Sequence, residues 1–267
     1  MTVMPIGAEP SLRARRLNFL ATSSAEEMIR RCRRTAMLLP ELADAIAVQK
    51  AAEPSRLFDI TDYPDDDKEL ITQTLGEGEV AGVAALSNRI TAQMQEAVMA
   101  GVWRVRFTDA EGRLVADYVE VASIPGAVRQ ACSILPAAIS HGPAPAGAMN
   151  VMPVLSEIGD RIARYRDGDP AHVITFSLFP MSPGDMAFLQ ETLGAGPVQL
   201  TSRGYRICRV VATGARNVWS VQVYNAMETI ILDTLEICDI PSVAIAAEED
   251  FQDSEARLRE IAEAYFK

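Results

Sequence analysis

Three short blocks of sequence occur twice in this chain, in the same order. LGEGEV at 75–80 returns as LGAGPV at 193–198, GVWRV at 101–105 returns as NVWSV at 217–221, and DYVEVASIP at 117–125 returns as DTLEICDIP at 233–241. The first pair is offset by 118 positions (193 against 75) and the other two by 116 (217 against 101). One length change of two residues, between the glycines and the tryptophan, aligns all three pairs. The chain therefore contains a duplicated unit.

The pattern within each unit predicts a helix followed by four strands. In the second unit, Pro183-Gly184-Asp185 begins a helix that Gly194 ends, and Asp65 to Gly76 repeats this in the first unit. Segments rich in Val, Ile, Tyr and Trp follow at 197–200, 206–212, 218–224 and 229–237. The short turns between them predict antiparallel pairing. An Ile-Pro ends the last strand, and a helix follows, at about 126–139 in the first unit and from an Asp253-Ser254 cap in the second.

These elements predict an α+β fold of two tandem repeats, each a helix, an antiparallel four-stranded meander and a helix, related by a pseudo-two-fold axis. The expected divisions are an N-terminal helical segment (1–62), repeat 1 (63–140), a linker with a connecting helix (141–170) and repeat 2 with the C-terminal helix (171–267). A capping box at Ser23 predicts a helix to Arg34, and a second helix is expected from Pro40 to Lys50. The connecting helix is expected at about 151–166.

Charge and hydropathy narrow the classes of partner. The net charge of −11 would repel a phosphate backbone, so nucleic-acid binding is disfavoured. No apolar run approaches the roughly 18 residues that cross a bilayer. The arginine-bearing first twenty residues do not resemble a secretory signal, so we expect a cytoplasmic protein without a membrane span.

Residue types that carry catalysis are scarce. The two histidines, His141 and His172, are 31 positions apart, and the four cysteines form no C-x-x-C pair. Nucleophile elbows, phosphate loops and dinucleotide fingerprints are also missing from the sequence. We expect a protein that is not an enzyme and has neither a metal nor another cofactor. Cys208 and Cys238 could hold iron, but buried free thiols are the favoured interpretation.

Three repeated features leave an alternative open. The glycines of each G-x-G are expected to stop a helix and form a tight turn, with an anion-binding loop as the alternative. Trp103 and Trp219 are expected to anchor the core, or else to form interface hot spots. Glu120 and Glu236 recur with Asp117 and Asp233, three positions apart and so on opposite strand faces. One acid of each pair is expected in solvent, and the other is expected to hold a turn or cap the next helix. A four-acid metal or proton site across the pseudo-two-fold axis is the alternative.

The second unit resembles a known family over residues 203–258. The pattern of the HupH/HyaF hydrogenase expression/formation proteins is matched at nine positions: Arg203, Gly204, Tyr205, Trp219, Asn225, Glu236, Pro241, Asp250 and Ser254. The first unit is similar through LGEGEV, Gly101 to Arg104 and Ile124-Pro125. The proline-rich start and Gly-Pro-Gly-Ser-Gln block of many members are reduced here to Pro5-Ile6-Gly7.

The resemblance implies an accessory protein for maturation of uptake nickel–iron hydrogenase. Such a protein is expected to be an assembly chaperone or scaffold whose partners are the iron–sulfur small subunit and other hydrogenase accessory proteins. A metal-handling or redox factor that delivers iron is the alternative, and a homodimer is a further possibility. The candidate partner-binding residues are Trp103, Glu120, Arg203, Tyr205, Trp219, Asn225 and Glu236.

Overall fold

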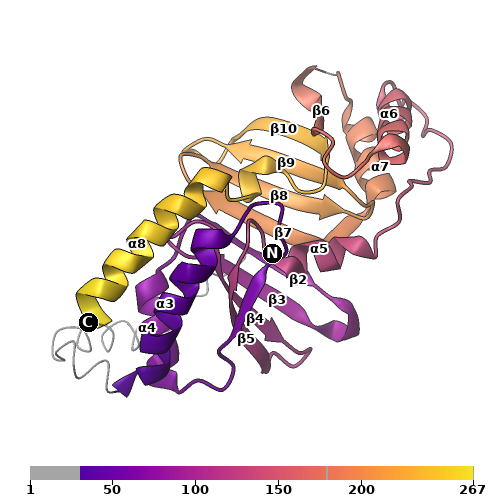
Figure 1. Ribbon diagram of the computed structural model, residues 1–267. Coiled ribbons are helices and arrows are strands. Elements are labelled where there is room, and N and C mark those ends of the chain that lie inside the picture. Colours follow the sequence, from indigo (N-terminus) through magenta and orange to yellow (C-terminus); the bar gives the residue numbers. More distant parts are fainter. Residues whose placement is uncertain (1–30, 179, 267) are drawn as a thin grey trace.

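The computed structural model describes residues 31–178 and 180–266, and its centre is one antiparallel sheet of ten strands (Figure 1). The strand order is β1-β5-β4-β3-β2-β7-β8-β9-β10-β6. The strands are β1 (Arg56–Asp59), β2 (Val80–Ala85), β3 (Thr91–Glu96), β4 (Val102–Thr108), β5 (Leu114–Val121), β6 (His172–Thr175), β7 (Ala195–Arg203), β8 (Ile207–Thr213), β9 (Val218–Tyr224) and β10 (Ile230–Ile237). The α-helices are α3 (Arg33–Val48), α4 (Asp65–Leu75), α5 (Gly126–Ser133), α6 (Val151–Arg164), α7 (Pro183–Leu193) and α8 (Glu248–Phe266).

The same succession of elements occurs twice. Helix, strand, helix and four consecutive strands run as α3, β1, α4 and β2–β5, and then as α6, β6, α7 and β7–β10. The two-residue length change inferred from the sequence lies between the first two strands of each meander, where residues 86–90 connect β2 to β3 and residues 204–206 connect β7 to β8. The α+β class is confirmed. Each half also has a fifth strand, β1 or β6, that the sequence pattern did not predict.

The two halves join through β2 and β7, whose register is symmetric about one residue pair. Gly82 lies opposite Leu200, with Val80 opposite Ser202 on one side and Ala84 opposite Val198 on the other. A Cβ atom on Gly82 would lie 2.5 Å from both the Gln199 carbonyl oxygen and the Leu200 Cδ2. Glycine is therefore required at position 82, because a side chain there would push β2 and β7 apart.

The paired glycines predicted to stop a helix do so in both halves. Gly76 follows α4 with φ of 63° and Gly194 follows α7 with φ of 65°, a backbone region that favours glycine. The second glycine of each pair serves close backbone packing. A Cβ on Gly78 would lie 2.0 Å from the Ala97 carbonyl oxygen, and one on Gly196 would lie 2.3 Å from that of Thr213. These contacts support the helix-stop and tight-turn interpretation.

A repeated buried aspartate ties the two helices of each half together. Asp67 of α4 accepts hydrogen bonds at Oδ1 from the backbone N–H (2.8 Å) and hydroxyl (2.9 Å) of Thr35, in the first turn of α3. Asp185 of α7 accepts from the N–H groups of Met149 (2.9 Å) and Val151 (3.2 Å) at the start of α6. Burial acts to raise the pKa of Asp185, but hydrogen bonds from Ser182, Met149 and Val151 hold it well below its usual range.

The C-terminal part of each half crosses to the other half. The yellow helix α8 follows the second meander but lies beside α3 of the first half (Figure 1), where Ser254 donates to the Ala100 carbonyl oxygen at 2.9 Å. In the opposite direction, the segment after α5 reaches the second half. There, the Arg216 backbone N–H donates to the Pro136 carbonyl at 2.8 Å, and its Nε donates to that of Leu135 at 3.0 Å. The two halves are thus interlocked.

Four expected helix boundaries were wrong or lie outside the described residues. The helix expected at about 126–139 ends at Ser133. Pro40 was expected to begin a helix but lies inside α3, where the buried side chains of Leu38, Leu39 and Leu42 stabilise the helix across it. Helix α8 begins at Glu248, five residues before the expected cap at Asp253, and Ser254 lies within it. Of the helix expected from Ser23 to Arg34, residues 23–30 lie outside the described residues, while Arg33 and Arg34 belong to α3 and so do not end a separate helix.

Candidate functional site

The two tryptophans predicted as core anchors or hot spots are completely buried. Both are 0% exposed and belong to one hydrophobic cluster that draws side chains from both halves of the sheet. The Nε1 of Trp103 donates to the Ala122 carbonyl oxygen and that of Trp219 to the Asp239 carbonyl oxygen, each at 2.9 Å. In this fold they act as core anchors and offer no surface to a partner.

The carboxylates Glu120 and Asp117 have separate structural roles on opposite faces of β5. Glu120 accepts a hydrogen bond at Oε1 from the Gly126 N–H at 2.8 Å, so it caps α5, as expected for one acid of the pair. The expectation of one acid in solvent was wrong in this half, because Glu120 and Asp117 are each 2% exposed. Asp117 faces α4, where it forms an ion pair with Arg104. Burial raises the pKa of Glu120, while the Gly126 N–H acts against that effect.

The hypothesis of a four-acid site was wrong. Glu120 and Glu236 lie in β5 and β10, which six other strands separate in the sheet. Burial raises the pKa of Glu236, and burial together with this carboxylate raises the pKa of Cys208 to about 11 and of Cys238 to about 12. Both sulfurs therefore remain thiols at neutral pH. Within 31–178 and 180–266, no three His, Cys, Asp or Glu side chains are grouped so as to hold a metal ion.

Arg203, Tyr205 and Asn225 gather at one end of the second meander. Arg203 ends β7, opposite Ile207, which pairs in turn with Tyr224 of β9. Tyr205 is 98% exposed, with the Arg206 guanidinium 5.8 Å from its ring centre. Asn225 forms the next turn, since its Oδ1 accepts from the N–H groups of Met227 (2.9 Å) and Thr229 (3.0 Å). The side chain of Asn225 thus holds the turn between β9 and β10, whereas the side chain of Tyr205 is open to solvent.

Large apolar side chains are exposed around these turns. We define the β10-edge surface as the exposed side chains Tyr205, Ile207, Met227, Ile230, Ile231 and Leu232. Ile207, Tyr224 and Ile230 lie side by side across β8, β9 and β10. Sequence reasoning missed the isoleucines and Met227, because a strand-like apolar run does not show which end of the strand is left uncovered.

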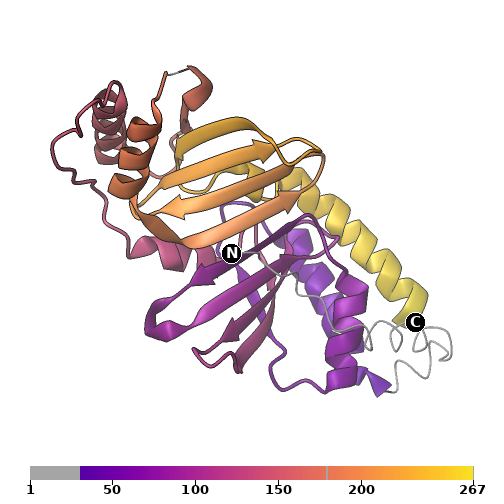
Figure 2. The same ribbon diagram turned by 180° about the vertical axis from the view of Figure 1, so that it is seen from behind.

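The edge of β10 next to this surface has no neighbouring strand. β6 pairs only with Thr234–Ile237, and the 3-10 turn that follows it, Phe176–Leu178, contacts β10 without forming a strand. The backbone from Ile230 to Asp233 therefore has no strand pairing on its outer side. Figure 2 shows the strands of the second half, in orange, from behind. An uncovered edge beside apolar side chains is a surface on which another polypeptide can form a strand.

The corresponding turn of the first half is more polar, although Leu114 and Val115 of β5 are as exposed as Ile230 and Ile231 of β10. Its β4–β5 turn holds Asp109, Glu111 and Arg113 in place of Asn225, Met227 and Thr229. Asp109 accepts from the backbone N–H groups of Glu111 (3.0 Å) and Arg113 (2.9 Å). The apolar turn is therefore a property of the second half.

A family model and several named proteins match this chain. The model described as HupH hydrogenase expression protein, C-terminal conserved region, matches residues 34–139 and again 148–265. The chain belongs to the HupH family. The two matched segments fit the two repeats, and each includes the first helix and the short strand of its half.

The relatives of this family member carry hydrogenase names. It is 88% identical over 267 residues to Hydrogenase expression/formation protein HupH of Rhizobium leguminosarum bv. viciae, covering 100% of this chain and 95% of that one. It is 42% identical to HoxQ of Azotobacter vinelandii, covering 85% and 80% of the two chains. It is 34% identical to Hydrogenase-1 operon protein HyaF of Escherichia coli K12, covering 83% and 74%. These names support a hydrogenase accessory role.

An acidic cavity of about 680 Å³ lies where the two halves of this HupH-family chain meet. Its lining includes Arg203 of β7 and four acidic residues, Glu77, Glu79, Glu96 and Asp250. Glu96 is buried and accepts at Oε1 from the Gly101 N–H at 3.2 Å. Burial raises the pKa of Glu96 to about 7, although backbone hydrogen bonds from Gly101 and Val80 act in the opposite direction. The described residues contain no helix apolar and long enough to cross a membrane.

We predict that Glu96→Gln changes how stability depends on pH. The folded pKa of about 7 exceeds the ordinary value of 4.5, so the stabilisation by the protonated carboxyl is complete below about pH 4.5 and is lost as pH rises through 7. At pH 8 the variant should be more stable by up to about 3 kcal/mol, and near pH 4.5 it should match the parent chain. Urea unfolding at several pH values measures this difference. Equal differences at pH 5 and pH 8 would contradict it.

Proposed function

We propose that this protein is a cytoplasmic assembly chaperone or scaffold for uptake nickel–iron hydrogenase, and that it acts on the iron–sulfur small subunit. The hydrogenase expression/formation names of its relatives support the accessory role. The single observation that carries the binding role is the β10-edge surface, with its exposed apolar side chains beside an uncovered strand edge. Other hydrogenase accessory proteins are the further partners we propose.

An extended segment of the client would add to the sheet beside Ile230 to Asp233. Backbone hydrogen bonds to a free edge supply affinity that does not depend on the client sequence. Ile230, Ile231 and Leu232 are 40–45% exposed and Met227 is 82% exposed, so they would contact apolar side chains of the added segment. Covering this surface would protect an unassembled client from aggregation. It would also pair a strand edge through which copies of this chain could themselves aggregate.

The duplication fits a division of labour between the halves. We infer that two four-stranded meanders, related by a pseudo-two-fold axis through the Gly82–Leu200 pair, arose from one ancestral unit. The first half, with its polar turn at Asp109, would serve as support. The second half, with Met227 at the matching turn, would bind the client.

The test is co-purification with the hydrogenase small subunit under reducing, anaerobic conditions. Ile231→Asp places a charge in the β10-edge surface and should lower recovery of the small subunit at least about tenfold. The matched control is Val115→Asp, which changes the corresponding position of β5, where the side chain is 51% exposed against 45% for Ile231. The control should leave recovery unchanged, because it adds the same exposed charge outside the β10-edge surface.

Three outcomes would contradict the proposal in different ways. Equal loss in both variants would mean that the second half has no special role. Unchanged recovery with Ile231→Asp would place the client elsewhere. If the parent chain recovers no small subunit, and light scattering shows a dimer that Ile231→Asp dissociates, the uncovered edge serves pairing of two copies and the chaperone role is wrong.

A further inference from the structure

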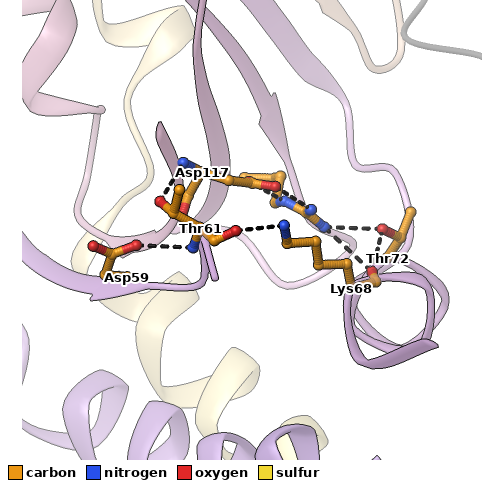
Figure 3. A network of polar contacts seen from close by, with 6 residues as sticks. Asp59, Thr61, Lys68, Thr72 and Asp117 are labelled. Carbon is orange, nitrogen blue, oxygen red and sulfur yellow. Dashed lines mark hydrogen bonds and ion pairs between the residues drawn. The ribbon is translucent and has the colours of Figure 1, made fainter. Parts of the chain in front are cut away.

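A buried ion pair fills the space between helix and sheet in the first half. The Nε and Nη2 of Arg104 each donate to one carboxylate oxygen of Asp117 at 2.6 Å, and Nη1 donates to the Thr72 hydroxyl at 2.9 Å. Figure 3 shows Asp117 and Thr72 on opposite sides of this space, with Lys68 on the same helix as Thr72. The guanidinium thus joins β4 and β5 to α4, in a two-pronged geometry that is specific to arginine.

The second half keeps the carboxylate and lacks the guanidinium. Asp233 pairs with Gln222 in the sheet as Asp117 pairs with Arg106, so the two aspartates occupy equivalent positions. The residue equivalent to Arg104 is Ser220, and the β10 backbone that carries Asp233 belongs to the uncovered edge. The second half therefore has a short side chain at the position where the first half has the one that neutralises the acid.

The space that Arg104 fills in the first half is, in the second half, a pocket of about 140 Å³. Ser220, Gln222 and Asp233 form its polar side, while Met186, Leu189 and Leu193 of α7 form an apolar wall. In the described part of the chain, the Asp233 carboxylate accepts one long hydrogen bond, from Gln222 Nε2 at 3.4 Å, and forms no ion pair. Burial raises the pKa of Asp233, with Gln222 acting against it, as expected for a carboxylate without a cation.

We propose that this pocket binds the guanidinium group of an arginine side chain from a partner polypeptide, with Asp233 accepting both of its parallel N–H groups as Asp117 accepts those of Arg104. The apolar wall on α7 would contact the methylene groups of that side chain. Asp233 lies on the uncovered part of β10, so a segment paired with this edge would carry its arginine next to the pocket. The inference deepens the proposed function, because it gives the bound segment a sequence requirement.

The test uses small peptides, so that binding of arginine in the pocket is measured separately from binding of the hydrogenase small subunit. Nuclear magnetic resonance titration with the capped tripeptide Val-Arg-Val should shift the backbone amides of Ser220, Gln222 and Asp233 in a saturable way. The matched ligand Val-citrulline-Val has nearly the same shape without the charge, and it should bind at least about tenfold more weakly. Asp233→Asn should lower the affinity for the arginine peptide by a similar factor.

A second variant separates ligand binding from folding. Ser220→Arg supplies from inside the chain the side chain that Arg104 supplies in the first half. It should abolish peptide binding without lowering the midpoint of thermal unfolding. Equal binding of the two peptides, binding that survives Ser220→Arg, or no saturable shift up to about 100 mM peptide would overturn the proposal. If the arginine peptide binds as expected while the small subunit is not recovered, the pocket stands and only the identity of the client is wrong.

Discussion

Replacing Trp219 with alanine should lower the free energy of unfolding by about 3–5 kcal/mol. The indole is 0% exposed, and its removal leaves a cavity in a hydrophobic cluster that both halves share. It also leaves the Asp239 carbonyl oxygen without its donor, which was 2.9 Å away. Urea unfolding followed by far-ultraviolet circular dichroism gives the value directly.

The matched variant in the first half makes this prediction sharper. Trp103→Ala removes an equally buried indole, whose Nε1 donates to the Ala122 carbonyl oxygen at 2.9 Å, and the loss should be of the same size. Replacement by phenylalanine keeps most of the apolar volume and should be less damaging in both halves. A loss below about 1 kcal/mol for either alanine variant would mean that the shared core does not hold the halves together.

Replacing Arg104 with methionine should destabilise the chain by about 3–5 kcal/mol. The variant leaves the Asp117 carboxylate buried without the two 2.6 Å hydrogen bonds that neutralise it. Much of the loss comes from that stranded charge, so a second substitution that removes the charge should recover stability. The double variant Arg104→Met with Asp117→Leu should lie within about 1–2 kcal/mol of the parent chain.

A matched change in the second half serves as the control for this cycle. Ser220→Ala alters the position equivalent to Arg104, where no ion pair exists, and should change stability by less than about 0.5 kcal/mol. If Arg104→Met is as mild as this control, the ion pair contributes little. The presence of an ion pair at Arg104 and its absence at Ser220 would then make no difference to the free energy of unfolding.

The repeated blocks predicted the two meanders because each block combines a structural stop with a strand. Gly76 and Gly194 end a helix at a backbone angle that favours glycine, and Trp103 and Trp219 mark buried strands, so both signals are local. β1 and β6 escaped prediction because four-residue segments show no alternation to recognise. Pro40 misled the helix assignment, since buried leucines on either side outweigh the lost backbone hydrogen bond.

The candidate site was only partly predictable, because a sequence pattern does not show which residues are exposed. Tyr205 stood out from the family pattern and is exposed, whereas Trp219 stood out equally and is buried. Ile231 is exposed because β6 is short and leaves part of β10 unpaired, and β1 leaves the equivalent part of β5, with Val115, unpaired in the same way. The difference between the halves lies in the neighbouring turn, where Met227 stands against Glu111. The pocket beside Asp233 could be inferred only after the register had aligned it with Asp117.

The glycine–leucine pair at the centre of the sheet has a consequence for how such a chain can arise. Two copies of the first half, associated through β2, would face glycine with glycine and leave a hole, while two copies of the second half would bring Leu200 against itself. Only a pair of unlike halves places one residue of each kind at that position, and fusion in one chain keeps the unlike halves together. Either half made alone would therefore lack the complementary strand that it needs, and we expect the two halves to associate with each other in preference to copies of themselves.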